Sequence, residues 1–261
     1  MKKNKICTFL AFYTAAVLSL SLPAWASQVT ISPLDPGTST SQSQEAQPTQ
    51  QTQPSNTQNT ASQTTDISSI AKPTIASQGA VLLNAADGSV LFSKNGETQY
   101  YPASITKLMT ALLVAENCSL DDTVTFSATA TTNLESGAVS IGMTEGDIMT
   151  VRQCLYALLL KSANEVGNAL AEHVAGSNAA FAEKMNAKAA SLGCTNTHFA
   201  NPHGLNDPNH YTTPHDMALI ARAAFANDIV KTVASTRTYT LPATKKNPSG
   251  LTVTMGHKML N

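Results

Sequence analysis

Segments with strand character lie at both ends of the region after residue 72, and segments with helix character lie between them. Near the start, two β-type runs at 80–84 and 89–93 flank Asp87-Gly88, which is a hairpin signal. Near the end, residues 236–241 and 251–255 alternate like strands on either side of a turn. This order predicts an α+β domain in which helices pack on an antiparallel sheet.

Helix boundaries between these strands are marked by residues that cap helix ends. A serine or threonine precedes three of the helix-forming segments, and a glycine follows two of them. We expect helices over 154–160, 166–174, 178–193 and 214–226. The residues that carry these signals are Thr150 with Gln153, Gly176, Ser177, Gly193, and Thr213 with Pro214 and Asp216.

The segment 101–113 places a serine and a lysine three residues apart at the start of an apolar, helix-forming run. Positions i and i+3 share one face of a helix, so the Lys107 amine can reach the Ser104 hydroxyl. A serine needs a base to become a nucleophile near neutral pH, and a desolvated lysine can be that base. Pro102 and Ala103 place Ser104 at the helix N-terminus, where backbone N–H groups favour negative charge on an attacked carbonyl oxygen. Taken alone, the same pattern also suits an N-capping serine beside a solvated lysine.

A second polar element, Ser162-Ala163-Asn164, interrupts two apolar helical segments. Such a break could project a hydroxyl and a carboxamide into a cleft. The hydroxyl would relay a proton, and the amide would bind a substrate carbonyl and the lysine. Alone this element suits a plain turn. Behind Ser-x-x-Lys it is more specific, because Ser-x-x-Lys, a Ser-Asp-Asn-type element and Lys-Thr-Gly form the signature of β-lactamases and penicillin-binding proteins.

These elements resemble the serine D-alanyl-D-alanine carboxypeptidases among the low-molecular-mass penicillin-binding proteins. Residues 103–110 resemble the nucleophile segment of that family, and 158–165 its second motif. Residues 199–205 and 210–218 resemble a long segment typical of these peptidases. The resemblance implies the β-lactamase/DD-peptidase-like transpeptidase fold. It also implies an enzyme that removes the terminal D-alanine from peptidoglycan stem peptides.

Carried over position by position, the resemblance implies a role for each residue of the two motifs. Ser104 would attack the penultimate D-Ala carbonyl and form an acyl-enzyme, while Lys107 accepts its proton. Ser162 would pass a proton to the leaving D-alanine, and Asn164 would hold the substrate backbone and Lys107. β-Lactams would acylate Ser104 and leave slowly. The family often has an aspartate where Glu165 stands, and no cofactor is implied.

The third motif of the family, Lys-Thr-Gly on a strand that lines the cleft, does not occur in the sequence. The last residues, 256–261, resemble the segment that precedes this strand in the family. We therefore expect a catalytic domain that is incomplete at its C-terminus. By resemblance, the strand would carry the cation for the substrate carboxylate and a second oxyanion N–H. Loss of one such donor typically lowers a rate about 10²–10³-fold.

The chain is expected to have three parts. Residues 1–26 have the basic start, apolar stretch and small-residue cleavage site of a signal peptide. Residues 27–72 are rich in Ser, Thr and Gln, which is typical of a disordered spacer. Residues 73–261 form the catalytic domain. We expect a protein secreted to the periplasm, cell surface or cell wall, with any peripheral membrane association supplied by sequence not present in this chain.

Other kinds of site receive less support from the sequence. The formal net charge is −1 and no basic cluster is interleaved with aromatic residues, so nucleic acid is not an expected partner. The spacings of His203, His210 and His215 match no common metal-ligand pattern, and we expect loop and capping roles for them. Glu135 and Glu145 could act as a deacylation base of the class A β-lactamase kind, but a solvated surface position is favoured. Buried free thiols are expected at Cys118, Cys154 and Cys194.

Two other functions fit the same motifs. A β-lactamase on this scaffold would turn over benzylpenicillin rapidly without releasing D-alanine from a peptide. A non-catalytic cell-wall or penicillin-binding module would keep its ligand binding after Ser104→Ala, whereas the carboxypeptidase would lose the covalent adduct.

Overall fold

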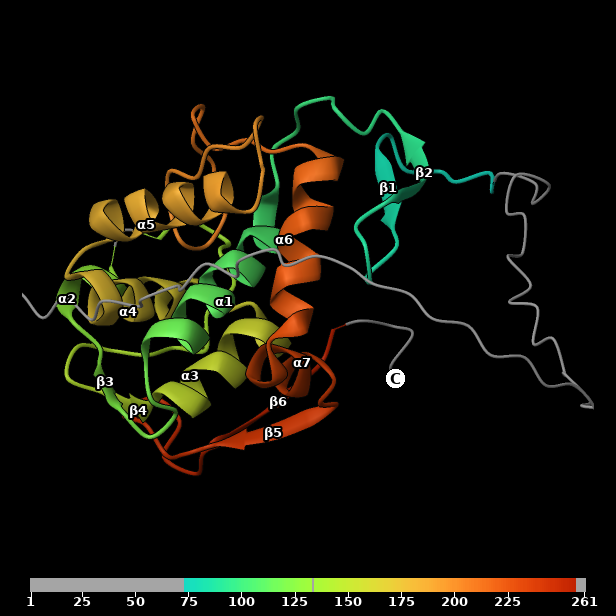
Figure 1. Cartoon of the computed structure of the whole chain (residues 1–261). Helices are drawn as coiled ribbons and strands as arrows, with labels where there is room; N and C mark the ends of the chain where they lie inside the picture. Colours follow the sequence, from blue (N-terminus) through green and yellow to red (C-terminus); the bar gives the residue numbers. More distant parts are fainter. Residues whose placement is uncertain (1–72, 133, 257–261) are drawn as a thin grey trace, which may run out of the picture. The chain divides into compact units, whose positions relative to one another are not determined.

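The computed structural model describes residues 73–132 and 134–256. The expected signal peptide and spacer lie outside the described residues, as do residues 257–261. In the described part, helices are packed together and three short two-stranded sheets lie around them (Figure 1). Within those ranges, no helix combines the length and apolar character that crossing a membrane requires.

Each of the three sheets is an antiparallel pair of short strands. The expected hairpins near residues 80–94 and 238–254 are both confirmed, and a third pair joins two segments of the polar stretch after the first long helix. The α+β class is therefore confirmed. The expectation of one shared sheet is not met among the described residues, because each strand pairs with one partner and no hydrogen bonds join the pairs. The pairs are β1 (Ala80–Leu83) with β2 (Val90–Lys94), β3 (Thr123–Thr125) with β4 (Ile148–Thr150), and β5 (Thr238–Leu241) with β6 (Leu251–Thr254).

The helices follow the capping signals of the sequence closely. Thr150 and Gln153 form the expected capping box, and Ser177 and Thr213 each accept a hydrogen bond from the first turn of their helix. A short helix that was not expected follows Asn227, whose side chain caps it. The elements are η2 (Ala103–Thr106), α1 (Lys107–Asn117), α2 (Ala128–Thr131), α3 (Val151–Tyr156), η3 (Ala157–Lys161), α4 (Asn164–Ala175), α5 (Asn178–Ser191), α6 (Pro214–Ala226) and α7 (Asp228–Ala234).

Helix α1 lies in the middle of the packed helices, where it contacts α4, α5, α6 and α7 (Figure 1). Apolar side chains of α1 and η3 are buried in the core, with Met109, Leu112 and Leu158 at most 1% exposed. Leu159 is partly buried, packs against this core and also lines a cleft. Burial of α1 on several sides fixes the position of its first turn, which directly follows η2, the turn that carries Ser104.

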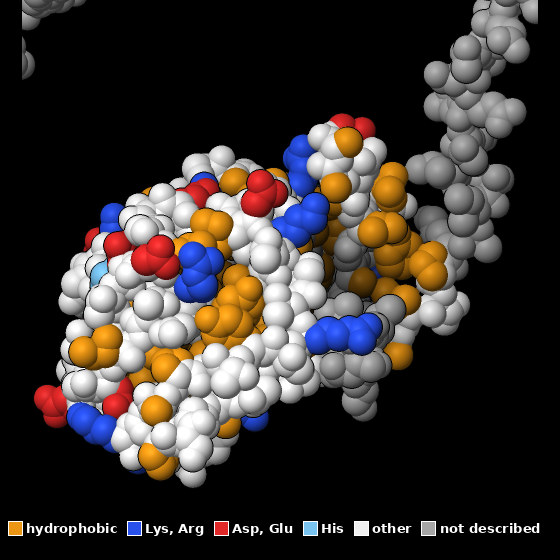
Figure 2. Space-filling model, turned by 90° about the horizontal axis from the view of Figure 1, so that it is seen from below, with side chains coloured by type: hydrophobic (Ala, Val, Ile, Leu, Met, Phe, Trp, Pro, Cys, Tyr) orange, Lys and Arg blue, Asp and Glu red, His pale blue; other side chains and the backbone are white. Residues whose placement is uncertain are grey.

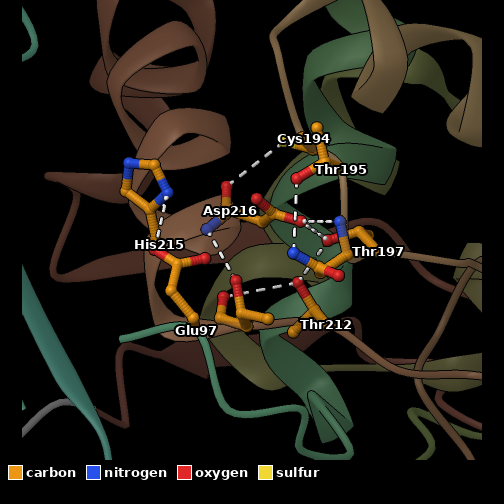
Figure 3. A network of polar contacts seen from close by, with 9 residues as sticks. Glu97, Cys194, Thr195, Thr197, Thr212, His215 and Asp216 are labelled. Carbon is orange, nitrogen blue, oxygen red and sulfur yellow. Dashed lines mark hydrogen bonds and ion pairs between the residues drawn. The ribbon is translucent and has the colours of Figure 1, made fainter. Parts of the chain in front are cut away.

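A network of polar contacts joins the segment 195–213 to the N-terminus of α6 (Figure 3). The carboxylate of Asp216 is buried, and its Oδ2 accepts hydrogen bonds from Asn196 N at 2.8 Å and Thr197 Oγ1 at 2.7 Å. Thr197 Oγ1 also lies 2.8 Å from Thr212 Oγ1, near the other end of the segment. Both ends of the segment are therefore held against the N-terminus of α6. Residues between the two ends contact α1, where Lys107 and Thr110 donate hydrogen bonds to backbone carbonyls of the segment.

A mainly apolar groove of about 720 Å³ lies between β1 and α6. Its lining includes Val81, Leu83, Leu219 and Phe225, and its charged residue is Arg222, which donates to two backbone carbonyls. The lower face of the molecule also carries hydrophobic side chains in separate patches among scattered charges (Figure 2). The groove contains no nucleophile or base, so it is not the candidate active site.

Candidate active site

The turn that carries Ser104 is a 3-10 turn, η2, placed directly ahead of α1. Ser104 is exposed, whereas Thr106 and Lys107 are buried. The preceding Ala103 has φ 49°, which is a left-handed conformation that costs energy for a residue with a side chain. Gly204 packs against this turn, and a Cβ on Gly204 would lie 1.9 Å from Ala103 O. The close approach of the two backbones therefore requires glycine at position 204.

Lys107 lies beneath Ser104 and is 2% exposed. Its Nζ donates hydrogen bonds to Ser104 Oγ at 3.2 Å, Asn164 Oδ1 at 2.8 Å and His203 O at 2.7 Å. The contact expected from the i, i+3 spacing is thus present. Burial lowers the pKa of the Lys107 amine to about 8, although the negative charge of Glu165 opposes this change. A lysine with this pKa can exist as a neutral amine near physiological pH.

The second motif follows a π-helical turn, η3, which continues directly from α3. Ser162 ends this turn with φ 64°, a left-handed conformation that is unusual for a residue other than glycine. Its Oγ is buried and has no hydrogen-bond partner among the described residues. A π-helical turn and a strained residue both occur frequently at functional sites. Ser162 therefore presents an unpaired hydroxyl at the position where a proton relay was expected.

Asn164 is the first residue of α4, and its amide bridges two segments. Its Nδ2 donates to Val139 O at 2.9 Å, and its backbone N donates to the same oxygen at 3.0 Å. Its Oδ1 accepts the hydrogen bond from Lys107. The interaction with Lys107 that was expected for Asn164 is therefore present.

Three of the residues expected to act in catalysis line one cleft of about 300 Å³. Ser104 comes from η2, Lys107 is the first residue of α1, and Ser162 comes from the break between η3 and α4. Asn164 reaches this group through its hydrogen bond to Lys107. The rest of the lining is apolar and consists of Ile105, Leu108, Leu158 and Leu159.

Two buried histidines support the turn from behind. Ala200 N donates to His210 Nδ1, so His210 Nε2 carries the proton and donates to Thr106 Oγ1 at 2.8 Å. Burial lowers the pKa of His210 to about 4, and burial with the charge of Lys107 lowers the pKa of His203 to about 3. Both rings are therefore neutral near pH 7. The loop role expected for these histidines is confirmed by their contacts, but the carbonyl of His203 as an acceptor for Lys107 was not expected.

The remaining titratable residues lie outside the cleft lining. Glu135 and Glu145 are exposed, as expected, and Glu135 accepts a hydrogen bond from Asn206 N. His215 lies 3.2 Å from the carboxylate of Glu97 (Figure 3). The three cysteines in the described part of the chain carry free thiols, and Cys154 and Cys194 are buried as expected, whereas Cys118 is only half-buried. One ligand atom each from Cys118, Asp122 and His173 lie within 4.8 Å of one another, but Asp122 Oδ2 already accepts a hydrogen bond from Ser119 N.

Comparison with known proteins identifies a family and relatives that match most of the described region. A family model described as D-alanyl-D-alanine carboxypeptidase matches residues 64–255. The D-alanyl-D-alanine carboxypeptidase of Streptomyces sp. (strain K15) is 37% identical over 197 residues, which cover 71% of this chain and 67% of that protein. The D-alanyl-D-alanine carboxypeptidase DacF of Bacillus subtilis is 38% identical over 150 residues, which cover 56% of this chain and 38% of that protein. The chain thus spans about two thirds of the first relative and well under half of the second.

Solved structures give the same result for the fold. The Streptomyces K15 DD-transpeptidase matches with a TM-score of 0.68 and 33% identity, over 74% of this chain and 78% of that one. The D-alanyl-D-alanine carboxypeptidase DacD from Francisella tularensis matches with a TM-score of 0.63 and 32% identity, over 69% of this chain and 44% of that one.

Proposed function

The chain belongs to the D-alanyl-D-alanine carboxypeptidase family, and we propose that it removes the terminal D-alanine from peptidoglycan stem peptides through an acyl-enzyme on Ser104. The observation that carries this proposal is the contact of Lys107 with Ser104. A buried amine with a lowered pKa lies within hydrogen-bond distance of an exposed serine hydroxyl in a cleft. This is the arrangement that activates a serine without a histidine.

The proposed reaction uses each residue in turn. Ser104 Oγ attacks the carbonyl carbon of the penultimate D-alanine, and the neutral Lys107 amine accepts the hydroxyl proton. When the C–N bond of the tetrahedral intermediate breaks, Ser162 Oγ passes a proton to the leaving nitrogen and takes one in turn from the protonated Lys107, so D-alanine departs and the Lys107 amine is neutral again. A water then attacks the ester carbonyl, which regenerates the Ser104 hydroxyl. Asn164 holds Lys107 through Oδ1 and offers an amide hydrogen to the substrate backbone.

The same chemistry accounts for capture of β-lactams. The strained lactam carbonyl is attacked by Ser104 Oγ, but the ring nitrogen stays tethered to the acyl group, so the leaving group is not expelled and hydrolysis is slow. Action on peptidoglycan requires a location outside the cytoplasmic membrane, and the signal peptide expected from the sequence supports this part of the proposal.

We expect the purified protein to release D-alanine from a stem-peptide analogue that ends in D-Ala-D-Ala. The reaction is followed by a D-amino-acid oxidase assay, and turnover of benzylpenicillin is measured in parallel. D-Alanine release with slow penicillin turnover supports the proposal. Fast penicillin turnover without D-alanine release identifies a β-lactamase, and reversible penicillin binding without either product identifies a non-catalytic module.

Acylation of the protein is expected to become faster as the pH rises through about 8. Burial lowers the pKa of Lys107 to about 8, and the amine is a base only when neutral. A group with this pKa is about one-tenth neutral at pH 7 and about nine-tenths neutral at pH 9, so the rate should rise about tenfold between them. Intact-mass spectrometry after short exposures to benzylpenicillin measures the rate at each pH. A flat profile over this range contradicts the assignment of Lys107 as the base.

A further inference from the structure

Glu165, the residue after Asn164, carries a carboxylate that is buried beside the cleft. It is 1% exposed, and its Oε1 accepts hydrogen bonds from Ser140 Oγ at 2.6 Å, Ile141 N at 2.7 Å and Gly142 N at 3.1 Å. Its Oε2 is buried without a hydrogen-bond partner among the described residues, and no salt bridge neutralises it there. A buried carboxylate without a paired cation costs folding free energy. Packing alone therefore does not account for a glutamate at this position.

The three hydrogen bonds of Glu165 hold the segment 139–142 against α4. Val139, at the start of this segment, uses its carbonyl oxygen to accept from both Asn164 N and Asn164 Nδ2. The terminal torsion of an asparagine is soft, so an amide can rotate unless a partner fixes it. With Nδ2 fixed on Val139 O, Oδ1 must face Lys107 Nζ, where it is found at 2.8 Å. A reversed amide would place two donors against each other.

Glu165 also supplies negative charge near Lys107. Two titratable side chains among the described residues interact electrostatically with Lys107, namely Glu165 from α4 and His203 from the loop beneath. The His203 ring is neutral, because burial and Lys107 lower its pKa to about 3. The other contacts of Lys107 are with a hydroxyl, an amide and a carbonyl, which are all neutral. Glu165 is therefore the anion that favours the protonated form of Lys107.

We propose that Glu165 is a positioning residue for this reaction: it holds residues 139–142 so that Val139 orients the Asn164 amide toward Lys107, and its negative charge stabilises the protonated amine. This inference rests on the proposed function, since it assigns Lys107 as the base that takes and returns the proton of Ser104. The carboxylate then acts on the base from outside the cleft, because Glu165 is not among the residues that line it.

The test compares Glu165→Gln with a matched control on the same helix. Glu165→Gln keeps the length and one acceptor oxygen but removes the charge. Glu172→Gln makes the same change two turns later on α4, where the carboxylate accepts from Ser127 Oγ and Thr129 Oγ1. Lysine labelled with ¹³C at Cε reports the pKa of Lys107 by NMR titration, and the spectrum of Lys107→Arg assigns its signal.

Glu165→Gln is expected to lower the pKa of Lys107 by about one unit, because the protonated amine loses its counter-charge. The rise of the acylation rate with pH should move to lower pH by the same amount. Glu172→Gln should leave both quantities unchanged. An unchanged Lys107 pKa in Glu165→Gln, with equal losses of melting temperature in the two variants, would show that Glu165 is merely structural and would overturn the inference.

The positioning role has its own readout. Glu165→Ala removes the anchor of residues 139–142 and should lower the plateau acylation rate about tenfold or more, whereas Glu165→Gln, which retains an acceptor, should lower it less. If Glu165→Ala does not fold, Glu165→Asp takes its place, because its shorter side chain reaches the segment poorly. Equal plateau acylation rates in the wild type and in these variants would refute the role of Glu165 in positioning Asn164.

The two proposals fail in different ways. A wild-type protein that forms no penicillin adduct and releases no D-alanine refutes the proposed function, while the NMR titration still decides whether Glu165 controls the Lys107 amine. An active wild type with a Lys107 pKa that does not respond to Glu165→Gln refutes the inference and leaves the function standing.

Discussion

Ser104→Ala is expected to abolish covalent capture of benzylpenicillin and to lower D-alanine release by about 10⁴-fold or more. The variant lacks the oxygen that forms the ester, and no other hydroxyl can replace it. Ser162 lines the same cleft, but Lys107 donates to Ser104, Asn164 and His203 and not to Ser162. Intact-mass spectrometry after incubation with benzylpenicillin shows the adduct directly as an increase equal to the mass of the drug.

The first control for Ser104→Ala is its free energy of unfolding, which shows whether the variant is still folded. Ser104 is exposed and its hydroxyl has one hydrogen bond, so its loss should change the free energy of unfolding by less than about 1 kcal/mol. Ser191→Ala on α5 makes the same chemical change at an exposed site, where the hydroxyl donates to Lys188 O. It should form the adduct at the wild-type rate. An adduct on Ser104→Ala would show that the nucleophile lies elsewhere.

Features that depend on neighbouring residues were predictable from the sequence. The i, i+3 spacing predicted that the Lys107 amine would contact Ser104 Oγ, and the structure places them 3.2 Å apart. The capping box at Thr150 begins α3, and the turn at Gly88 joins β1 to β2. Both follow from residues that are close in sequence to the helix or strand whose limit they mark. These signals are readable because the interacting groups are side chains with fixed spacing along a helix or turn.

Features that depend on the backbone or on distant segments were not predictable. The π-helical turn before Ser162 follows an apolar run that reads as an ordinary helix. The His203 carbonyl reaches Lys107 from 96 residues away, and every residue type has such a carbonyl. From the sequence, Glu165 would be taken for an ordinary acidic residue in the first turn of a helix. Its burial depends on residues 139–142, which are distant in sequence and fold over it. The pairing of the strands in three separate sheets likewise depends on how the helices are placed between them.

Lys107→Arg is expected to lower the acylation rate about 10³-fold or more, although it keeps the positive charge. An arginine side chain cannot be deprotonated in a protein, so it cannot accept the proton of Ser104. The change thus separates a lysine that acts as a base from one that only stabilises negative charge. Lys161→Arg, at the exposed end of η3, is the matched control and should retain the wild-type rate. A Lys107→Arg variant that is acylated at the wild-type rate excludes the base role.

Lys107 is 2% exposed, so the larger arginine could disturb the packing, and Lys107→Met provides a second variant of similar volume. The stability of Lys107→Met relative to the wild type gives a test that is independent of catalysis.

The pKa of Lys107 is about 8 in the folded protein and close to 10.5 in the unfolded chain, so between these pH values the unfolded chain binds more protons than the folded protein. The burial of the charged amine therefore destabilises the fold below about pH 8, and this cost is lost as the pH rises to about 10.5. Relative to Lys107→Met, the wild type should gain up to about 3 kcal/mol of unfolding free energy across this window, as measured by urea denaturation. A constant difference between the two proteins would mean that the Lys107 amine keeps its ordinary pKa, and a base with that pKa could not serve Ser104 near neutral pH.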